Sequence, residues 1–301
     1  MEDVIIIGGG PAGLTAAIYV ERAGKHALVF EGNVCGGQIV NAAKVENYPS
    51  IKEISGADFA MNLYEQAKNL GAEIKFEKVV GIYDNKNYKT VKTTTGEVQA
   101  KAVILATGAS NRKLGIDKEK EFIGRGVSYC ATCDGAFFRN KSVAVVGGGN
   151  TAIEDAMFLS NYCSKVYIIH RRTELRGEEK VIKELKEKSN VEFILEANVT
   201  KLIGDGKLEQ IEITKNNGVT QKIDVSGLFV AIGQVPGNGA FENIIKLDSY
   251  GYVDATEDCK TNVDGIFVAG DARVKTVRQL TTACSDGTVA ALAAINYLRN
   301  K

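Results

Sequence analysis

The sequence has few of the features that mark membrane, secreted or zinc-binding proteins. Its 301 residues include only two histidines. No apolar run reaches the roughly 18 residues that a spanning helix needs, and Met1-Glu2-Asp3 lacks the basic start of a signal peptide. Lys+Arg and Asp+Glu both number 37, so no global field favours nucleic acid. We therefore expect a cytoplasmic protein with no membrane and no nucleic-acid partner.

Proline is also rare, with 3 residues, whereas glycine is frequent, with 32. The glycines cluster after apolar strands and do not form a flexible linker. The chain is long enough for two domains with full cores.

The N-terminal stretch DVIIIGGGPAG has the order of a dinucleotide-binding motif. A short apolar strand precedes Gly8, Gly10 and Gly13, and an Ala-rich helix follows. Glycines at this spacing permit a tight turn and bring a pyrophosphate close to the helix N-terminus. The next strand ends in Glu31, 23 positions after Gly8, as expected of an acid that holds a ribose diol. The alternative is a tight turn of any doubly wound fold.

The same fingerprint recurs in the second half of the chain. A strand over residues 141–146 leads into Gly147 and Gly149, with alanine in the third position, and the following helix begins with Asn150 and Thr151. The positions equivalent to Glu31 hold a cationic cluster: His170, Arg171, Arg172 and Arg176. The fork of an arginine suits a phosphate. The first site therefore favours FAD and the second the 2′-phosphate of NADPH, with a solvated run of charge as the alternative for the arginines.

Cys130 and Cys133 form a Cys-x-x-Cys motif, and Asp134 follows directly. This spacing allows a small disulfide and often lowers the pKa of one thiol, and the carboxyl is placed to exchange a proton with sulfur. The alternatives are a structural disulfide or half of a zinc site, which needs four ligands. The other cysteines are scattered through the chain: Cys35, Cys163, Cys259 and Cys284. Redox chemistry is therefore favoured.

The order of the motifs predicts that one domain is inserted into another. Two strands that end in a glycine turn, AVILATG at 102–108 and GLFVAIG at 227–233, precede candidate linkers at 111–126 and 234–237. We expect an α/β fold with two Rossmann-like dinucleotide-binding domains. The FAD domain would comprise residues 1–112 and 237–301, and the NADPH domain with the dithiol would comprise residues 113–236.

The motifs, in order, resemble those of the low-molecular-weight thioredoxin reductases of bacteria and archaea over nearly the whole chain. The stretches concerned are GGGPAG, GGQ with VENYP, ATGAS, GRGVSYCATCDG, VVGGGNTAIEDA, HRRTELR and GIFVAGDARVKTVRQ. The resemblance implies a homodimeric enzyme that passes electrons from NADPH through FAD to a Cys130–Cys133 disulfide, and then to oxidised thioredoxin. It also implies that the inserted domain rotates between the two half-reactions.

The resemblance further implies roles for single residues. Cys133 would face the flavin, Cys130 would attack the disulfide of thioredoxin, and Asp134 would donate a proton to the emerging thiolate. The residues expected near FAD are Gly8, Gly10, Gly13, Glu31, Gly36, Gly37, Gln38, Asn47, Asp271, Arg278 and Gln279. The residues expected to hold NADPH are Gly147, Gly149, Asn150, Thr151, His170, Arg171, Arg172 and Arg176. No metal is expected. From the residues alone, the loop-rich stretch 36–49 is explained equally well as a plain surface loop and as a segment that lines a cofactor.

Several related functions stay open at this point. The sequence does not distinguish thioredoxin from another small dithiol protein as the acceptor. It also does not distinguish a reductase from an oxygen-using dithiol oxidase. A redox sensor without turnover is disfavoured by Asp134 beside the dithiol. Glutathione and lipoamide reductases are disfavoured because their dithiol lies in the flavin domain, where this chain offers only Cys35.

Overall fold

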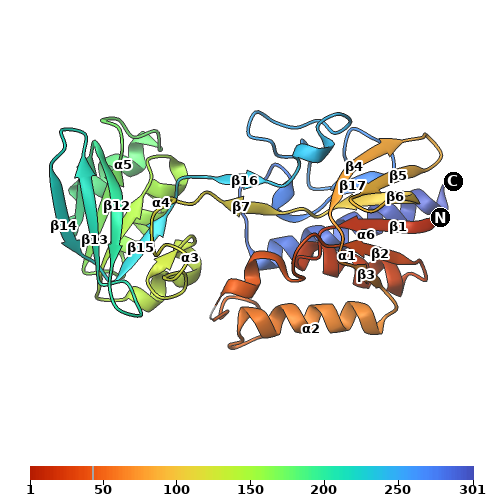
Figure 1. Ribbon diagram of the computed structural model, residues 1–301, viewed down its shortest axis with the longest axis horizontal. Coiled ribbons are helices and arrows are strands. Elements are labelled where there is room, and N and C mark those ends of the chain that lie inside the picture. The colour runs from red at the N-terminus through yellow and green to blue at the C-terminus, as the bar shows by residue number, and fades with distance from the viewer. Residues whose placement is uncertain (43) are drawn as a thin grey trace. The chain divides into compact units, whose positions relative to one another are not determined.

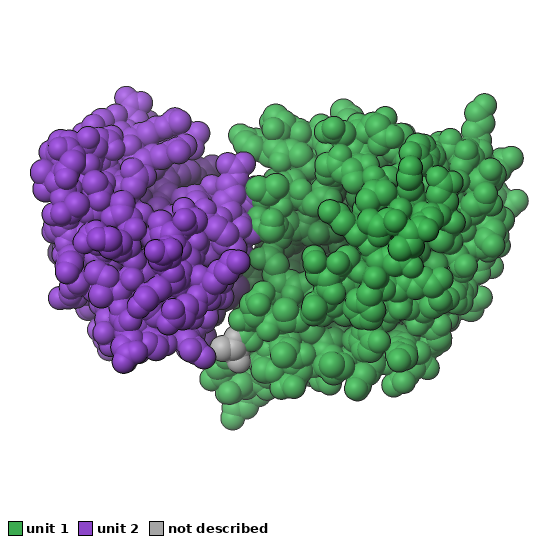
Figure 2. Space-filling view, viewed as in Figure 1, with its two compact units in different colours: residues 1–110, 235–301 green, residues 111–234 purple. Residues whose placement is uncertain are grey.

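The computed structural model describes residues 1–42 and 44–301. The chain forms two compact units, which Figure 2 shows in different colours: unit 1 comprises residues 1–110 and 235–301, and unit 2 comprises residues 111–234. Where the chain passes from one unit to the other, β7 (Ala109–Asn111) pairs with β16 (Gln234–Pro236). The two linkers therefore form a short two-stranded ribbon (Figure 1).

The polar segment 111–126 is not the free linker that its composition predicts. Phe122 is completely buried in unit 2, and Glu119 is only 3% exposed. The Glu119 carboxylate accepts hydrogen bonds from the backbone N–H groups of Leu114 and Gly115 and from the Tyr129 hydroxyl. The whole segment therefore belongs to unit 2, where the buried Glu119 carboxylate satisfies nearby backbone N–H groups.

Unit 1 is built on a seven-stranded sheet whose strands lie in the order β3, β2, β1, β6, β5, β4, with β17 also paired to β6. The parallel strands are β1 (Glu2–Ile7), β2 (Ala27–Phe30), β3 (Glu73–Lys75), β6 (Glu97–Leu105) and β17 (Ile266–Val268). The antiparallel strands are β4 (Val79–Asp84) and β5 (Lys89–Thr93).

Both faces of this sheet are covered, which explains the unbroken apolar runs of its central strands. Val4 and Ile6 of β1 pack with the helices on one face, whereas Ile5 and Ile7 pack in a separate cluster on the other face. The helices are α1 (Pro11–Arg22), α2 (Gly56–Asn69) and α6 (Leu280–Arg299), and the short turns are η1 (Gly37–Asn41), η3 (Gly239–Phe241) and η4 (Gly270–Ala272).

Unit 2 has a five-stranded parallel sheet. Its strands, in spatial order, are β11 (Val191–Leu195), β10 (Lys165–His170), β9 (Ser142–Val146), β15 (Gly227–Val230) and β8 (Val127–Ser128). The helices α4 (Asn150–Ser160) and α5 (Glu179–Glu187) pack with one hydrophobic cluster. A second cluster joins the sheet to an antiparallel layer of β12 (Ala197–Ile203), β13 (Gln210–Lys215) and β14 (Thr220–Asp224).

The register of each parallel sheet brings the sequence motifs to one edge. In unit 1, Ile7 pairs with both Phe30 and Leu105, so the turns that follow β1, β2 and β6 leave from the same edge. In unit 2, the segments that follow β8, β9 and β10 also leave at carboxyl ends, where open α/β sheets bind their ligands. The prediction of an α/β fold with two Rossmann-like sheets is confirmed. Across the part of the chain that the structure describes, every helix is too short or too polar to cross a membrane.

Candidate active site

The two cysteines of the Cys-x-x-Cys motif are joined as a disulfide, Cys130–Cys133. The strand β8 ends at Ser128, and Cys130 then caps the short helix α3 (Ala131–Asp134). The backbone N–H of Cys133 points at the Cys130 sulfur, with a distance of 3.2 Å between nitrogen and Sγ. Cys133 is exposed, whereas Cys130 is half-buried. A donor aimed at Cys130 would stabilise its thiolate once the disulfide opens.

Asp134 is held at both its backbone and its side chain. Its N–H donates to the Cys130 carbonyl oxygen at 3.1 Å, and its Oδ2 accepts a hydrogen bond of 2.6 Å from the Ser128 hydroxyl. Burial raises the pKa of Asp134, and the bond from Ser128 lowers it in part. A carboxyl with a raised pKa is suited to proton transfer closer to neutral pH.

Ser128 is a site residue that the sequence analysis did not single out. It lies within the stretch GRGVSYCATCDG, but a serine two positions before a cysteine looks like any polar strand residue. Its contact with Asp134 depends on the turn at Cys130, which brings residues 128 and 134 together.

The second nucleotide motif follows β9 in unit 2. Gly147 has a φ of 152°, and a Cβ on it would lie 2.3 Å from the Ala231 carbonyl oxygen, so only glycine fits. Gly149 caps α4 without a side-chain hydrogen bond, and nothing lies within 4 Å of the place its Cβ would take. Asn150 and Thr151 are exposed in the first turn of α4. This helix N-terminus has the open backbone that a phosphate needs.

The cationic cluster lies at the carboxyl end of β10, close to this motif. The N–H of Arg176 donates to the Gly148 carbonyl oxygen at 2.6 Å. Burial lowers the pKa of the His170 imidazole, and the charge of Arg176 and, to a smaller extent, of Arg171 and Arg172 adds to this effect. The three guanidinium groups are exposed, whereas His170 is buried. The arrangement offers several positive charges to one anionic group.

The first nucleotide motif follows β1 in unit 1. A Cβ on Gly13 would lie 1.9 Å from the Gly8 carbonyl oxygen, so the helix α1 approaches the strand closely. Gly10 caps α1 without a side-chain hydrogen bond. The carboxylate of Glu31 accepts hydrogen bonds from the N–H of Gly9 at 2.7 Å and of Asn33 at 2.8 Å. A carboxylate has further lone pairs, so Glu31 can also accept from ribose hydroxyls.

The remaining residues expected near FAD also lie in unit 1. Asp271, in η4, has a buried Oδ1 with no hydrogen-bond partner among the described residues, and burial raises its pKa. An acceptor of this kind suits a ligand that carries hydroxyl groups, such as FAD. The Arg278 guanidinium lies 4.2 Å from the centroid of the Tyr252 ring. The Asn47 amide lies 3.5 Å from the Gln279 side-chain oxygen, and the Gln38 amide donates to the Ala109 carbonyl oxygen. Gly36 and Gly37, which precede Gln38, have positive φ.

A buried ion network holds the turn that carries Asp271, and the sequence analysis missed it. Asp286, on α6, accepts hydrogen bonds from the N–H of Gly270 at 3.1 Å, from Arg273 at 2.9 and 3.0 Å, and from Lys275 at 2.8 Å. Burial raises the pKa of Asp286, but the bonds from Arg273 and Lys275 outweigh it, and the net effect lowers that pKa.

The four cysteines outside the motif are free thiols, one half-buried and three buried. Burial raises the pKa of Cys35 and of Cys163 to about 11 and that of Cys259 to about 12, so these thiols stay protonated and unreactive at neutral pH. Over residues 1–42 and 44–301, no group of three or more His, Cys, Asp or Glu side chains could hold a metal ion.

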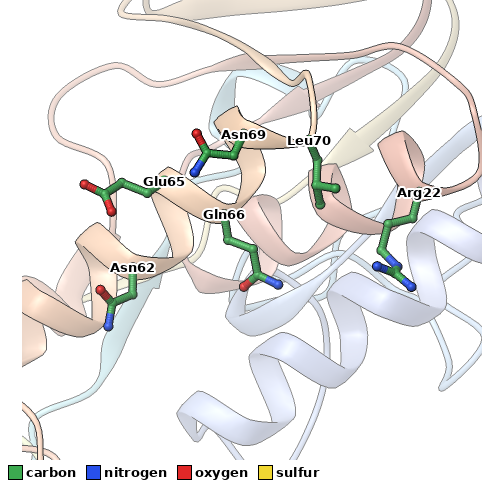
Figure 3. A pocket seen from close by; sticks show the side chains of 6 residues that line it. All are labelled: Arg22, Asn62, Glu65, Gln66, Asn69 and Leu70. Atoms are coloured by element: carbon green, nitrogen blue, oxygen red, sulfur yellow. The ribbon is translucent and has the colours of Figure 1, made fainter.

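A surface depression of about 450 Å³ lies elsewhere in unit 1. Figure 3 shows that Arg22 lines it from α1 and that the other residues come from α2 and from its C-cap, Leu70. Those residues are Asn62, Glu65, Gln66, Asn69 and Leu70. It contains no residue of the dithiol or the glycine motifs, so we do not assign it to the active site.

Comparisons with known proteins agree with this arrangement. Residues 2–287 match the family model of the pyridine nucleotide-disulphide oxidoreductases. The thioredoxin reductase of Listeria monocytogenes is 43% identical over 298 residues, which cover 98% of this chain and 93% of that protein. The thioredoxin reductase of Bacillus subtilis is 41% identical over 298 residues, which cover 98% of this chain and 94% of that protein.

Solved structures give the same result. The thioredoxin reductase from Streptococcus pyogenes superposes with a TM-score of 0.96 at 37% identity, covering 100% of this chain and 99% of that chain. That of Lactococcus lactis, in its FR conformation, gives a TM-score of 0.69 at 38% identity, with 100% of both chains covered. The chain therefore belongs to the pyridine nucleotide-disulphide oxidoreductase family and, within it, to the thioredoxin reductases.

Proposed function

We propose that this enzyme reduces thioredoxin with electrons from NADPH, which pass through FAD to the Cys130–Cys133 disulfide. The observation that carries the proposal is the disulfide itself, which lies at the end of a strand of the same parallel sheet that bears the second nucleotide motif. Two such motifs and one dithiol are the parts that this electron path needs. The names of the similar proteins support thioredoxin as the acceptor.

Unit 1 is the FAD domain in this proposal, and unit 2 is the NADPH domain. Gly8, Gly10, Gly13 and Glu31 would hold the adenosine and pyrophosphate of FAD, and Asp271 would hold a hydroxyl of its ribitol. FAD bound by these residues would supply the two-electron chemistry that links NADPH to the disulfide. Other FAD contacts are assigned to Gly36, Gly37, Gln38, Asn47, Arg278 and Gln279. The NADPH contacts are assigned to Gly147, Gly149, Asn150, Thr151, His170, Arg171, Arg172 and Arg176.

The dithiol then passes the electrons on by thiol–disulfide exchange. Two electrons open the Cys130–Cys133 bond, and Asp134 donates a proton to the emerging thiolate. Asp134 then takes the proton back from the Cys130 thiol, and the Cys130 thiolate attacks the disulfide of thioredoxin, which forms a mixed disulfide and releases one thioredoxin sulfur as a thiolate. Cys133 next attacks Cys130, so that the intramolecular disulfide forms again and the second thioredoxin thiol leaves. Thioredoxin gains the two electrons that the dithiol loses.

The proposal includes a rotation of unit 2 on its two linkers, because both the nicotinamide and the dithiol must reach one flavin. Two solved relatives support it. They have nearly equal identity to this chain, 37% and 38%, but TM-scores of 0.96 and 0.69. Relatives that differ from each other in domain arrangement would give such a spread. A homodimer in the cytoplasm, bound to neither membrane nor nucleic acid, completes the proposal and follows from the resemblance and from the balanced charge.

The experiment that tests this function is steady-state oxidation of NADPH by the FAD-loaded protein. We expect turnover that requires oxidised thioredoxin, that is slower with NADH, and that disappears in the Cys133→Ser variant. If NADPH reduces the flavin but thioredoxin is not reduced, the assignment of the two cofactors stands and thioredoxin is refuted as the acceptor. Turnover that survives in the variant would refute the role of the dithiol.

A further inference from the structure

The Ser128 side chain is hydrogen-bonded both to the Asp134 carboxylate and to the backbone of Cys130. Ser128 is the last residue of β8, and only 5% of it is exposed. Its Oγ lies 2.6 Å from Oδ2 of Asp134 and accepts a hydrogen bond of 3.1 Å from the backbone N–H of Cys130.

A hydroxyl has one proton to donate, and the geometry shows where it goes. The Cys130 carbonyl oxygen is 3.3 Å from the Ser128 Oγ, which is farther than the carboxylate oxygen at 2.6 Å. The carbonyl oxygen already accepts from the N–H of Asp134. The hydroxyl proton therefore goes to the carboxylate, and a chain of hydrogen bonds runs from the Cys130 N–H through the Ser128 hydroxyl to Asp134.

We infer that Ser128 is a positioning residue of the dithiol, whose hydroxyl fixes the Asp134 carboxyl group beside the turn that holds Cys130 and favours its ionised form. The inference rests on the proposed function, in which Asp134 exchanges a proton with the cysteine. Ser128 forms no bond with substrate and takes no electrons. It acts through the orientation and the protonation state of Asp134.

The electrostatics of the site give this role a direction. Burial raises the pKa of Asp134, and the hydrogen bond from Ser128 is the one opposing effect among the described residues. Loss of the hydroxyl would therefore raise the pKa of Asp134 further. In the reaction with an external disulfide, Asp134 accepts the Cys130 proton as a carboxylate, so the acidic limb of the rate profile should move to higher pH.

The titration of a second carboxyl group, that of Asp155, must be distinguished from that of Asp134. The helix α4 packs against α3 and carries Glu154 and Asp155. Burial, with a smaller contribution from Glu154, raises the pKa of Asp155 to about 7. The profile is therefore also recorded with the Asp155→Asn substitution present in every variant, which removes that titration.

The test uses the FAD-loaded protein, reduced with dithiothreitol and freed of it, and mixed with cystamine at a series of pH values. The fraction of re-formed Cys130–Cys133 disulfide is read by mass spectrometry after an acid quench. For Ser128→Ala we expect the acidic limb to move up by about one pH unit, which is about a tenfold lower rate on that limb. Ser128→Thr, which keeps the hydroxyl, should restore the wild-type profile.

Ser160→Ala is the matched control. Ser160 is buried in the same unit, and its hydroxyl donates to the Met157 carbonyl oxygen of its own helix. Its profile should not move. If Ser128→Ala does not fold, Ser128→Val replaces it, because valine has the shape of the threonine in Ser128→Thr but lacks the hydroxyl. A shift in the same direction is then expected.

A profile of Ser128→Ala or Ser128→Val that coincides with that of the wild type would overturn the inference. Asp134→Asn shows whether the proposed function fails instead. If Asp134→Asn abolishes the acidic limb while Ser128→Ala leaves it in place, only the role of Ser128 is wrong. If Asp134→Asn also leaves the limb unchanged, the proton exchange in the proposed function is wrong, and the role of Ser128 falls with it.

Discussion

Replacement of Asp286 by asparagine should destabilise unit 1 strongly. The side chain is 7% exposed and faces Arg273, which is 2% exposed, and Lys275, which is 5% exposed. Asparagine keeps the size of the side chain but removes its charge, so two buried cations lose their common partner. Removal of one partner of a buried ion pair costs about 3–5 kcal/mol. We expect the lower end, about 3 kcal/mol, because Arg273 keeps a bond to Glu257.

The free energy of unfolding is measured by urea titration of the FAD-loaded protein, with circular dichroism and flavin fluorescence as separate probes because two units can unfold separately. Glu257→Gln is the matched control, since Glu257 binds the same arginine but is 89% exposed, and it should cost less than about 1 kcal/mol. The double variant Asp286→Asn with Arg273→Met should recover part of the loss, because one stranded charge is gone. The reasoning is refuted if Asp286→Asn costs less than about 1 kcal/mol, or if Glu257→Gln costs as much.

The remaining predictions concern the two nucleotide motifs. Gly13→Ala should prevent retention of FAD, measured by the absorbance ratio at the flavin and protein bands, because its Cβ would lie 1.9 Å from a backbone oxygen. Gly149→Ala has open space at its Cβ, so the protein should keep FAD but bind NADPH more weakly, and an unchanged KM would contradict this. Arg171→Ala with Arg172→Ala should raise the KM for NADPH about tenfold or more and leave that for NADH nearly unchanged, whereas an equal effect on both coenzymes would remove the arginines from the 2′-phosphate site.

Much of the fold could be predicted from the sequence because its signals are local. A buried parallel strand is a short apolar run, and a glycine turn follows it directly, so the sequence places β1 and β9 to within a residue or two. The disulfide also depends on a separation of three positions, which the covalent chain alone brings within reach.

The failures concern polar residues that are buried. The segment 111–126 has the charged composition of a linker, but Glu119 is buried in it. Three hydrogen-bond donors compensate for the burial of its carboxylate. Composition does not reveal such a partner. Helix α6 begins at Leu280, because Gln279 and Thr282 form a capping box that apolar periodicity does not report.

The roles of Ser128 and Asp286 could not be predicted for a related reason. Each reaches its partner through a turn or through packing between elements, and the contact depends on a side-chain direction that spacing does not fix. Asp286 reads as a polar residue on the surface of a helix. In the structure it faces the end of β17, where Gly270 and Arg273 bond to it.

The central claim is that electrons leave the protein through Cys130, and trapping of the mixed disulfide tests it most directly. A thioredoxin that lacks its second cysteine is activated as a mixed disulfide with a small leaving thiol and is added to Cys133→Ser and to Cys130→Ser. We expect a covalent adduct at Cys130 in the first variant and a much lower yield in the second, although Cys133 is the more exposed of the two residues. An adduct that forms mainly through Cys133 would contradict the account.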